Sequence, residues 1–225
     1  MKIGGLQRSS MIDFPGYLSC VIFTRGCDLD CFYCHNRQML ADGDVTSEAE
    51  VFEFLQRRVG LLDGVVISGG EPALQKDLRR FVSQVKQMGF KIKLDTNGQH
   101  DGVVQGLLDI LDYVAVDIKC LPEDAQEVCG NRWAFARSER MVEILLRQRM
   151  EFEVRTTLYP GMTFPKLCTL LSRLSEMPRY RLNFFQMPRE YKLQDGDRLM
   201  RPILSELEVR SKLMELKKFQ PNLVI

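Results

Sequence analysis

Two spacings of apolar residues alternate along the chain. Short runs rich in valine, isoleucine, leucine and phenylalanine are bounded by glycine, proline or polar residues, as is typical of buried strands. Between these runs, apolar residues recur every three or four positions, which predicts amphipathic helices. The predicted strands cover residues 18–24, 64–68, 90–94, 113–116, 151–158 and 181–186, with a further short strand at 2–6.

The predicted helices fill the intervals between the strands. The first begins at Thr46 or Ser47, either of which can cap it, and the second ends near Gly89. Residues 120–133 are predicted to form a long loop, and residues 187–202 are polar and irregular. Further helical patterns cover residues 103–108, 141–146, 166–174 and 204–219.

A strand followed by a helix, repeated about six times, predicts a fold of the α/β class. Parallel strands joined by right-handed crossovers would form a partial barrel of the (β/α)6 type, because six units fall short of the eight in a full TIM barrel. An open, doubly wound sheet is the alternative. We expect residues 1–225 to form a single domain, with an N-terminal arm at 1–17 and a C-terminal extension at 187–225 that carries a helix.

Composition and charge narrow the range of functions. The 225 residues are 45% hydrophobic and 27% charged, and the net charge is +1, as in an ordinary globular protein. Without a global positive field, we expect no nucleic-acid partner. No apolar run approaches the length of a membrane span, and the N-terminus lacks the apolar core of a signal peptide. We therefore expect a cytoplasmic protein without a membrane partner.

Three of the seven cysteines form the most informative motif. Cys27, Cys31 and Cys34 follow the strand at 18–24 with the spacing CxxxCxxC. Three thiolates can hold a metal centre that keeps one position for a substrate, whereas a structural zinc site or an electron-carrier cluster usually takes four protein ligands. An odd number of cysteines without a secretory signal argues against disulfides. The other cysteines are predicted to be buried or incidental thiols: Cys20, Cys120, Cys129 and Cys168.

Polar residues and glycines also follow the other predicted strands. In barrel folds the carboxyl ends of the strands form the catalytic face, so we expect these residues to converge there. They are Gly69, Gly70, Glu71 and Pro72, then Asp95, Thr96, Asn97 and Gly98, then Asp117 and Lys119, then Arg155 late in its strand, and Gln186.

The first of these groups admits two interpretations. Gly69 and Gly70 lack Cβ atoms, so a ligand could approach the backbone, and Glu71 could accept hydrogen bonds from a cationic amine. The alternative is an ordinary turn from a strand into a helix, in which Pro72 suits the first helical turn.

The charged residues that follow the strands also admit two interpretations each. Asp95 and Asp117 could bind a cation or ribose hydroxyls, or they could be solvated loop acids or helix caps. Lys119 and Arg155 could pair with the carboxylate of a ligand, or form salt bridges with the two aspartates. The two histidines, at positions 35 and 100, are not expected to be metal ligands, so a mechanism based on a histidine base is not predicted.

These motifs together resemble the radical SAM (S-adenosylmethionine) superfamily. The signature of that family is CxxxCxxC with an aromatic residue before the last cysteine, which is Tyr33 here. Its second motif is GGEP, found at residues 69–72. The resemblance extends over most of the chain, to about Gln186.

Three further stretches resemble one branch of the superfamily. Residues 33–36, 95–98 and 117–119 are similar to those of the glycyl-radical-enzyme activases. Residues 5–27 are most similar to the activating proteins of anaerobic ribonucleoside-triphosphate reductases.

The resemblance implies a 4Fe-4S cluster held by the catalytic residues Cys27, Cys31 and Cys34. One iron then lacks a protein ligand and binds the amino and carboxylate groups of SAM. The GGEP motif is implied to hold the amino group, with Glu71 as the main acceptor. On that basis, a Glu71→Ala protein is expected to keep its cluster and to bind SAM weakly.

The remaining site residues are also assigned through the resemblance. It places Tyr33 and His35 along the adenine, and Asp117 and Lys119 at the ribose and carboxylate of SAM. Arg155 is expected to contact SAM as well. A monovalent cation is implied at Asp95, Thr96 and Asp117. Gln186 stands where the pyruvate formate-lyase activase has a histidine, and it is proposed by position alone as cofactor-binding.

The resemblance finally implies a reaction. A flavodoxin- or ferredoxin-type donor supplies one electron, SAM is cleaved reductively, and the 5′-deoxyadenosyl radical abstracts hydrogen from a glycine Cα of a glycyl radical enzyme. The expected partner is of the anaerobic ribonucleotide reductase type. One alternative is a radical SAM enzyme acting on a small molecule, similar to 7-carboxy-7-deazaguanine synthase, and another is a non-enzymatic iron–sulfur module. An open barrel mouth shaped by residues 120–133 and 187–202 would favour a protein substrate.

Overall fold

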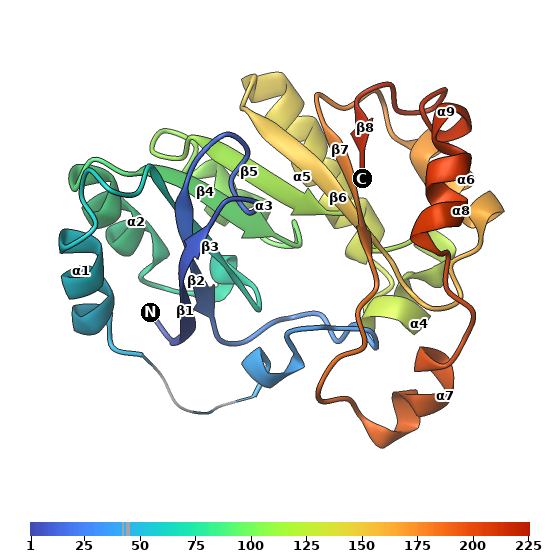
Figure 1. Ribbon diagram of the computed structural model, residues 1–225, viewed down its shortest axis with the longest axis horizontal. Coiled ribbons are helices and arrows are strands. Elements are labelled where there is room, and N and C mark those ends of the chain that lie inside the picture. The colour runs from blue at the N-terminus through green and yellow to red at the C-terminus, as the bar shows by residue number, and fades with distance from the viewer. Residues whose placement is uncertain (42, 44–45) are drawn as a thin grey trace.

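The computed structural model describes residues 1–41, 43 and 46–225. The strands in this part of the chain form one sheet, whose spatial order follows the order of the chain from β1 to β8. Figure 1 shows this sheet curving, with helices beside its first and last strands. The strands are β1 (Ile3–Ser10), β2 (Ser19–Thr24), β3 (Gly64–Gly69), β4 (Lys91–Thr96), β5 (Tyr113–Asp117), β6 (Phe152–Leu158), β7 (Tyr180–Phe184) and β8 (Leu223–Val224).

The sheet is almost entirely parallel. β1 pairs antiparallel with β2, and every later pair from β2–β3 to β7–β8 is parallel. A doubly wound sheet would reverse its strand order at an internal switch point. The sequential order therefore excludes that alternative and confirms the predicted partial barrel, which is open because β1 and β8 are the edges of the sheet.

Helices connect the strands. The first is capped as predicted: the Ser47 hydroxyl accepts the Glu50 N–H (3.1 Å) and the Glu50 carboxylate accepts the Ser47 N–H (2.9 Å). The α-helices are α1 (Glu48–Gln56), α2 (Leu78–Gln87), α3 (Asp101–Gln105), α4 (Ala125–Cys129), α5 (Ala134–Gln148), α6 (Phe164–Arg173), α7 (Gly196–Leu199), α8 (Glu206–Ser211) and α9 (Leu213–Leu216). Short 3-10 helices lie at Arg37–Met39, Pro72–Leu74, Pro122–Asp124 and Leu193–Asp195.

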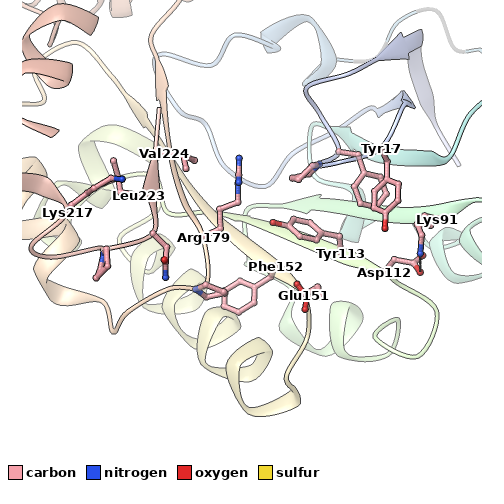
Figure 2. A pocket seen from close by; sticks show the side chains of 15 residues that line it. Tyr17, Lys91, Asp112, Tyr113, Glu151, Phe152, Arg179, Lys217, Leu223 and Val224 are labelled. Atoms are coloured by element: carbon pink, nitrogen blue, oxygen red, sulfur yellow. Dashed lines mark ion pairs between the residues drawn. The ribbon is translucent and has the colours of Figure 1, made fainter. Parts of the chain in front are cut away.

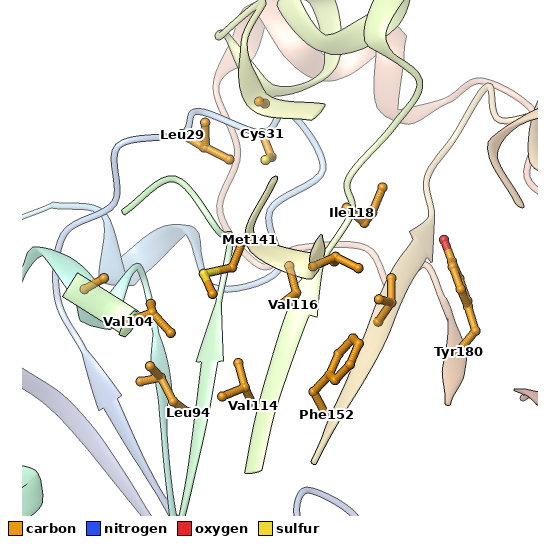
Figure 3. Packing of buried hydrophobic residues seen from close by; sticks show 14 of the residues in the cluster. Leu29, Cys31, Leu94, Val104, Val114, Val116, Ile118, Met141, Phe152 and Tyr180 are labelled. Carbon is orange, nitrogen blue, oxygen red and sulfur yellow. The ribbon is translucent and has the colours of Figure 1, made fainter. Parts of the chain in front are cut away.

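The central strands are buried on both faces, which fixes where they end. In β3, Val65, Val66 and Ile67 are all inaccessible to solvent. Figure 3 shows the buried side chains of β4, β5 and β6 leading up to Leu29 and Cys31, which lie beyond the carboxyl ends of these strands. Because parallel strands all point the same way, the residues that follow them are brought to one end of the barrel.

The N-terminal arm differs from the prediction. The strand expected at residues 2–6 continues to Ser10 as β1, so 8 residues of the arm at 1–17 belong to the sheet. Gln7, Arg8 and Ser9 are exposed. This edge strand therefore shows no hydrophobic alternation in its second half and is held by backbone pairing with β2.

The C-terminal half differs from the prediction in four places. The loop expected at 120–133 contains α4, and the helix expected at 204–219 is interrupted because Lys212 leaves the helical conformation (φ −107°, ψ 13°). The irregular segment at 187–202 contains α7. The C-terminal extension also adds β8 to the sheet, a strand of 2 residues that is too short to leave a sequence pattern.

Candidate active site

One cavity at the carboxyl ends of the strands gathers the predicted site. Its volume is about 740 Å³, which is within the range of small-molecule sites. Every predicted site residue except Glu71 lines it: Cys27, Cys31, Tyr33, Cys34, His35, Gly69, Gly70, Asp95, Thr96, Asp117, Lys119, Arg155 and Gln186. Residues spread over the chain from 27 to 186 thus share one space, as the positions after the strands predicted.

Backbone hydrogen bonds hold the cysteine loop on both sides. Gly26 N–H donates to Met39 O (2.8 Å), and Glu71 N–H donates to Gly26 O (2.7 Å), which ties the loop to the end of β3. On the far side, Asp30 N–H donates to the carbonyl of Cys129 in α4 (2.9 Å). The loop is therefore braced by two segments distant in sequence.

The two glycines after β3 are required by the protein's own backbone. A Cβ on Gly70 would lie 2.0 Å from Gly26 O, and a Cβ on Gly69 would lie 2.3 Å from Thr24 N. Gly69 also has φ +116°, a conformation that side chains disfavour. The close approach predicted for this pair is made by the end of β2 at Gly69 and by the cysteine loop at Gly70, and both glycines still line the cavity.

The structure places the Glu71 carboxylate behind the cavity wall, and its predicted role toward the amino group of SAM stays a prediction. The side chain is fully buried and does not line the cavity. Its Oε1 accepts hydrogen bonds from Ala73 N–H (3.0 Å) and the Thr96 hydroxyl (2.8 Å), and its Oε2 accepts one from Asn97 N–H (2.7 Å). The carboxylate therefore joins the end of β3 to the end of β4.

Burial raises the pKa of Glu71 to about 7, against the three hydrogen bonds that favour its ionised form. The ordinary pKa of this carboxyl group is 4.5. Between pH 4.5 and about pH 7, the folded protein therefore keeps a proton on Glu71 that the unfolded chain releases. The contribution of this group to stability is therefore full below pH 4.5 and is lost as the pH rises through about 7, at about 1.4 kcal/mol per pH unit.

We predict that Glu71→Gln removes this pH dependence, because the amide does not titrate. Thermal melts of cofactor-free protein between pH 4.5 and 8 test it. The variant is expected to be less stable throughout, since its amide nitrogen cannot accept from Asn97, but its melting temperature should change less with pH. Parallel pH profiles for the two proteins would contradict the assignment. The Glu71→Ala protein should also be less stable, because losing the carboxylate leaves three buried donors without their acceptor.

Asn97 is a site residue that sequence reasoning left without a role. Its side-chain N–H donates to Asp28 Oδ1 (2.8 Å) and lies 3.7 Å from Cys27 Sγ. His100 Nε2 lies 3.0 Å from the other oxygen of Asp28. The segment after β4 therefore positions the first cysteine of the loop. The available signal was the position of Asn97 directly after a buried strand.

Charges of alternating sign run across the ends of β4, β5 and β6. Arg155 donates through Nη1 to Asp95 (2.9 Å) and through Nε to Asp117 (2.8 Å). Lys119 donates to the other oxygen of Asp117 (2.9 Å), and Lys93 lies 3.4 Å from Asp95. Of the two interpretations left open by the sequence, the structure shows the salt bridges. Both oxygens of Asp117 are used, whereas Asp95 Oδ1 has no hydrogen-bond donor among the described residues.

These contacts fix the ionisation of Asp117, Lys119 and Arg155. Burial opposes the charge of Asp117, but Arg155 and Lys119 outweigh it and hold the pKa of that carboxyl well below its usual range. In turn, despite burial, Asp117 raises the pKa of both Lys119 and Arg155. The cavity wall thus carries the cations Lys119 and Arg155 on either side of the anion Asp117, a pattern suited to a zwitterionic ligand.

The three thiols fit a cluster better than a single ion. In the part of the chain that the structure describes, no group of three or more His, Cys, Asp or Glu side chains is placed to hold one metal ion. A 4Fe-4S cluster needs no such convergence, because each thiolate binds a different iron. Burial raises the pKa of Cys27 to about 12 and raises that of Cys34. Cluster assembly must therefore displace thiol protons.

The remaining predicted site residues are Tyr33, which is buried, and His35 and Gln186, which lie at the cavity wall. The Tyr33 ring is buried and stacks on Tyr159 with 5.3 Å between ring centroids, and Tyr33 lines the cavity. His35 and Gln186 line the cavity from the loop and from the segment after β7. Gln186 is exposed, so its side chain is accessible to a ligand or partner.

A second cavity lies at the opposite, amino ends of the strands. Its volume is about 770 Å³, and its wall includes Tyr17, Tyr113 and Arg179 (Figure 2). None of the predicted site residues lines it. The larger volume therefore does not mark the chemistry, which is concentrated at the other end.

Comparison with known proteins assigns the family. Residues 21–174 match the Radical SAM superfamily. The chain belongs to the radical SAM superfamily. It is therefore an enzyme that uses a 4Fe-4S cluster and SAM, and the alternative of a non-enzymatic iron–sulfur module is excluded.

Relatives of this radical SAM protein include activating enzymes. It is 31% identical to a protein of Methanocaldococcus jannaschii named as a candidate glycyl-radical enzyme activating enzyme, over 99% of this chain and 95% of the relative. It is 27% identical to the pyruvate formate-lyase 1-activating enzyme of Escherichia coli K12, over 71% of this chain and 68% of that enzyme.

Solved structures share the fold. SuiB of Streptococcus suis bound to S-adenosylmethionine superposes with a TM-score of 0.65 at 17% identity, covering 88% of this chain and 45% of the longer SuiB chain. A domain of a pyruvate-formate lyase-activating enzyme from Bacteroides vulgatus gives a TM-score of 0.51 at 16% identity, covering 69% of this chain and 94% of that domain. Within the described residues, none of the helices has the length and apolar character needed to cross a membrane.

Proposed function

We propose that this radical SAM enzyme is a glycyl-radical-enzyme activase. The observation that carries the proposal is the convergence of three thiols from one loop with polar groups from the ends of β3 to β7 on one cavity. The candidate activating enzyme of M. jannaschii supports it, because that relative matches almost the whole chain.

Different residues hold the two cofactors. Cys27, Cys31 and Cys34 hold the 4Fe-4S cluster as thiolates, and SAM binds beside it. When bound, the cluster and SAM supply the reductive cleavage that yields a 5′-deoxyadenosyl radical. The chain supplies position and charge: Asp117 orients Lys119 and Arg155 toward the carboxylate of SAM.

Tyr33 and His35 are assigned to the adenine of SAM, and Gly69 and Gly70 to its amino end. Asp95 and Gln186 complete the cofactor-binding set. All of these residues line the cavity.

A protein substrate is favoured by the segment that follows β7. This segment leaves the cavity at Gln186 and returns to it at Glu206. It is fastened to the cysteine loop, since Lys192 pairs with Asp30. Large apolar side chains are exposed along it, with exposed fractions of 49% for Met187, 47% for Tyr191, 95% for Leu193, 77% for Met200 and 52% for Ile203. Exposed apolar side chains beside a catalytic mouth suit a protein partner better than a small molecule.

The finer assignments rest on the sequence. Residues 5–27 favour an anaerobic ribonucleotide reductase as the glycyl radical partner, and a flavodoxin or ferredoxin is proposed as the electron donor. A cytoplasmic location is consistent with both. A monovalent cation at Asp95, Thr96 and Asp117 would compete with Arg155, which already bridges the two carboxylates.

Anaerobic reconstitution tests the function. The protein is loaded with iron and sulfide, reduced, supplied with SAM, and mixed separately with a purified anaerobic ribonucleotide reductase and a pyruvate formate-lyase. We expect 5′-deoxyadenosine and, with the reductase, a glycyl doublet in the electron paramagnetic resonance (EPR) spectrum.

The control is the same reductase with its radical-bearing glycine changed to alanine, which should give no doublet. Cleavage of SAM without a doublet in either partner would support the small-molecule alternative. Absence of 5′-deoxyadenosine under all conditions would overturn the activase proposal.

A further inference from the structure

The second half of β7 has a free edge. Within the described residues, β8 pairs with β7 only at Tyr180 and Arg181, and Figure 1 shows β8 as a short arrow beside β7. From Leu182 to Phe184 the strand therefore has no paired strand on that side. The Tyr180 N–H donates to Asn222 O on the β8 side (3.3 Å). Successive residues of a strand direct their N–H and C=O groups to alternate sides, so those of Phe184 face the free edge.

Asn183 is the residue of this edge whose side chain faces the active site. Tyr180 points to the other face of the sheet, where its hydroxyl meets that of Thr156 (2.7 Å). Side chains alternate along a strand, so Asn183, three positions later, points to the inner face. Its side chain is half-buried, lines the active-site cavity and makes no hydrogen bond within the part of the chain that the structure describes. The amide is thus free to donate to a ligand and to accept from it.

The free edge lies in the opening of the partial barrel, whose edge strands are β1 and β8. Arg181 Nη1 donates to Ile12 O (3.2 Å) in the connection between β1 and β2, and this contact crosses the opening where β8 ends. Beyond it, the residues from Leu182 to Phe184 all line the active-site cavity. The chain then continues into the segment that begins at Met187 and carries the exposed apolar side chains assigned above to a protein partner. The edge therefore connects the proposed partner surface with the cavity.

We propose that the glycine-bearing segment of the partner binds at this edge as an added strand, with its main chain hydrogen-bonded to Phe184 and to the Asn183 amide. The inference rests on the proposed function, which makes the main-chain Cα of a glycine the target of the radical.

The alternation of an added strand fits that target. A residue opposite Asn183 would share the inner face with it. Glycine carries a hydrogen where other residues carry a side chain, so this hydrogen would point into the cavity. The added strand thus accounts for the approach of a main-chain hydrogen, and not of a side chain, to the site of the radical.

N-methylated peptides test the added strand on the unaltered enzyme. A peptide of about nine residues copies the sequence around the radical-bearing glycine of the anaerobic reductase, with deuterium on the glycine Cα. Deuterium found in 5′-deoxyadenosine by mass spectrometry reports abstraction. A methyl group on a main-chain nitrogen removes one donor, and only alternate amides of the peptide would face β7. We therefore expect kcat/KM to fall about tenfold at every second position and to change little at the positions between.

Variants of β7 test the enzyme side of the same contact, after iron analysis has shown that each holds a cluster. Phe184→Ala removes the ring, and Phe184→Pro removes the edge N–H as well, which a strand edge tolerates. We expect kcat/KM to be about tenfold lower in Phe184→Pro than in Phe184→Ala. Asn183→Leu keeps the volume of the side chain without its hydrogen bonds and should raise the KM for the peptide about tenfold, with a smaller change in kcat.

Several results would overturn the added strand. One is the absence of an alternating pattern among the N-methylated peptides, and another is an equal rate in Phe184→Ala and Phe184→Pro. A protein that is dimeric alone and becomes monomeric in Phe184→Pro would assign the edge to a second copy of the chain. If the peptide is not a substrate, the three variants are compared on the intact reductase by the rate at which the glycyl doublet appears, and an unchanged rate in Asn183→Leu refutes the inference.

Failure of the proposed function has a different signature. If the intact reductase gains a glycyl radical while the pattern or the variants disagree, only the added strand is refuted. If neither deuterium transfer nor a doublet is found with any partner, the activase proposal itself is contradicted.

Discussion

A Cys34→Ala protein is expected to retain little iron and sulfide after anaerobic reconstitution and to leave SAM uncleaved. Cys34 lines the cavity with Cys27 and Cys31, and no other thiol of the described chain lines it. Removing one of three ligands leaves the cluster with two. The rate of 5′-deoxyadenosine formation should fall by more than about 100-fold, the upper end of the cost of losing a residue that merely supports a metal ligand.

The measurement is paired. Iron and sulfide analysis with the visible absorption of the cluster reports assembly, and chromatography of 5′-deoxyadenosine reports cleavage. Cys168→Ala changes the same residue type on α6 and should retain both signals. Full cluster content in Cys34→Ala would show that this thiol is not a ligand. Cys27→Ala should behave like Cys34→Ala.

Arg155→Ala is expected to have the second largest effect. Its guanidinium bridges Asp95 and Asp117, and its side chain is only 14% exposed. Removing one partner of a buried ion pair leaves uncompensated charge, which typically costs about 3 to 5 kcal/mol of folding free energy. SAM binding should be lost as well, because the cavity wall loses one of the two cations that contact Asp117.

The cost of Arg155→Ala should depend on pH. In the unaltered protein the lowered pKa of Asp117 contributes stability that is present above its ordinary value of 3.8 and is lost as the pH falls below it. The variant lacks Arg155, the main counter-charge of Asp117, so the ionised carboxylate stabilises its fold less. Protonation of Asp117 at low pH should therefore cost the variant less stability than it costs the unaltered protein. The difference in melting temperature between the two proteins is therefore expected to be large at neutral pH and to narrow as the pH falls through 3.8.

Two comparison variants sharpen this result. Arg155→Lys keeps a positive charge but not the planar fork that reaches both carboxylates, so an intermediate loss is expected. Arg210→Ala removes an exposed arginine, 53% accessible and paired with Glu206, and should cost less than about 1 kcal/mol. A loss in Arg155→Ala as small as that in Arg210→Ala would show that the buried row does not hold the site together.

Much of the site could be predicted because it depends on residues close in sequence and on the regular repeat of strands and helices. Cys27, Cys31 and Cys34 are close in the chain, and a strand-then-helix repeat brings residues after each strand to the same end of the barrel. Asp117 and Arg155 therefore meet although 38 positions separate them. Their direct pairing was one of two interpretations, and choosing between them required the distance between the side chains.

The hydrogen bonds of Glu71 could not be predicted from the sequence. A carboxylate beside two glycines suggested an acceptor for a ligand, but the N–H groups after β4 and after Glu71 itself compete for the same oxygens. Buried backbone donors require partners, and this carboxylate is their partner. Which acceptor a buried donor finds depends on packing that no local pattern records.

By itself the sequence determined the α/β class, the three-thiol loop and the strand ends that surround it, and it favoured the partial barrel that the strand order then confirmed. Hydrophobic periodicity and motif spacing are local properties, and the repeat of parallel units converts them into a shared end of the sheet. Only the tertiary structure decided that Gly69 and Gly70 accommodate the end of β2 and the cysteine loop, that Arg155 joins two aspartates, and that α4 lies against the cysteine loop. Those contacts join segments far apart in the chain, and their geometry is fixed by the packing of the whole barrel.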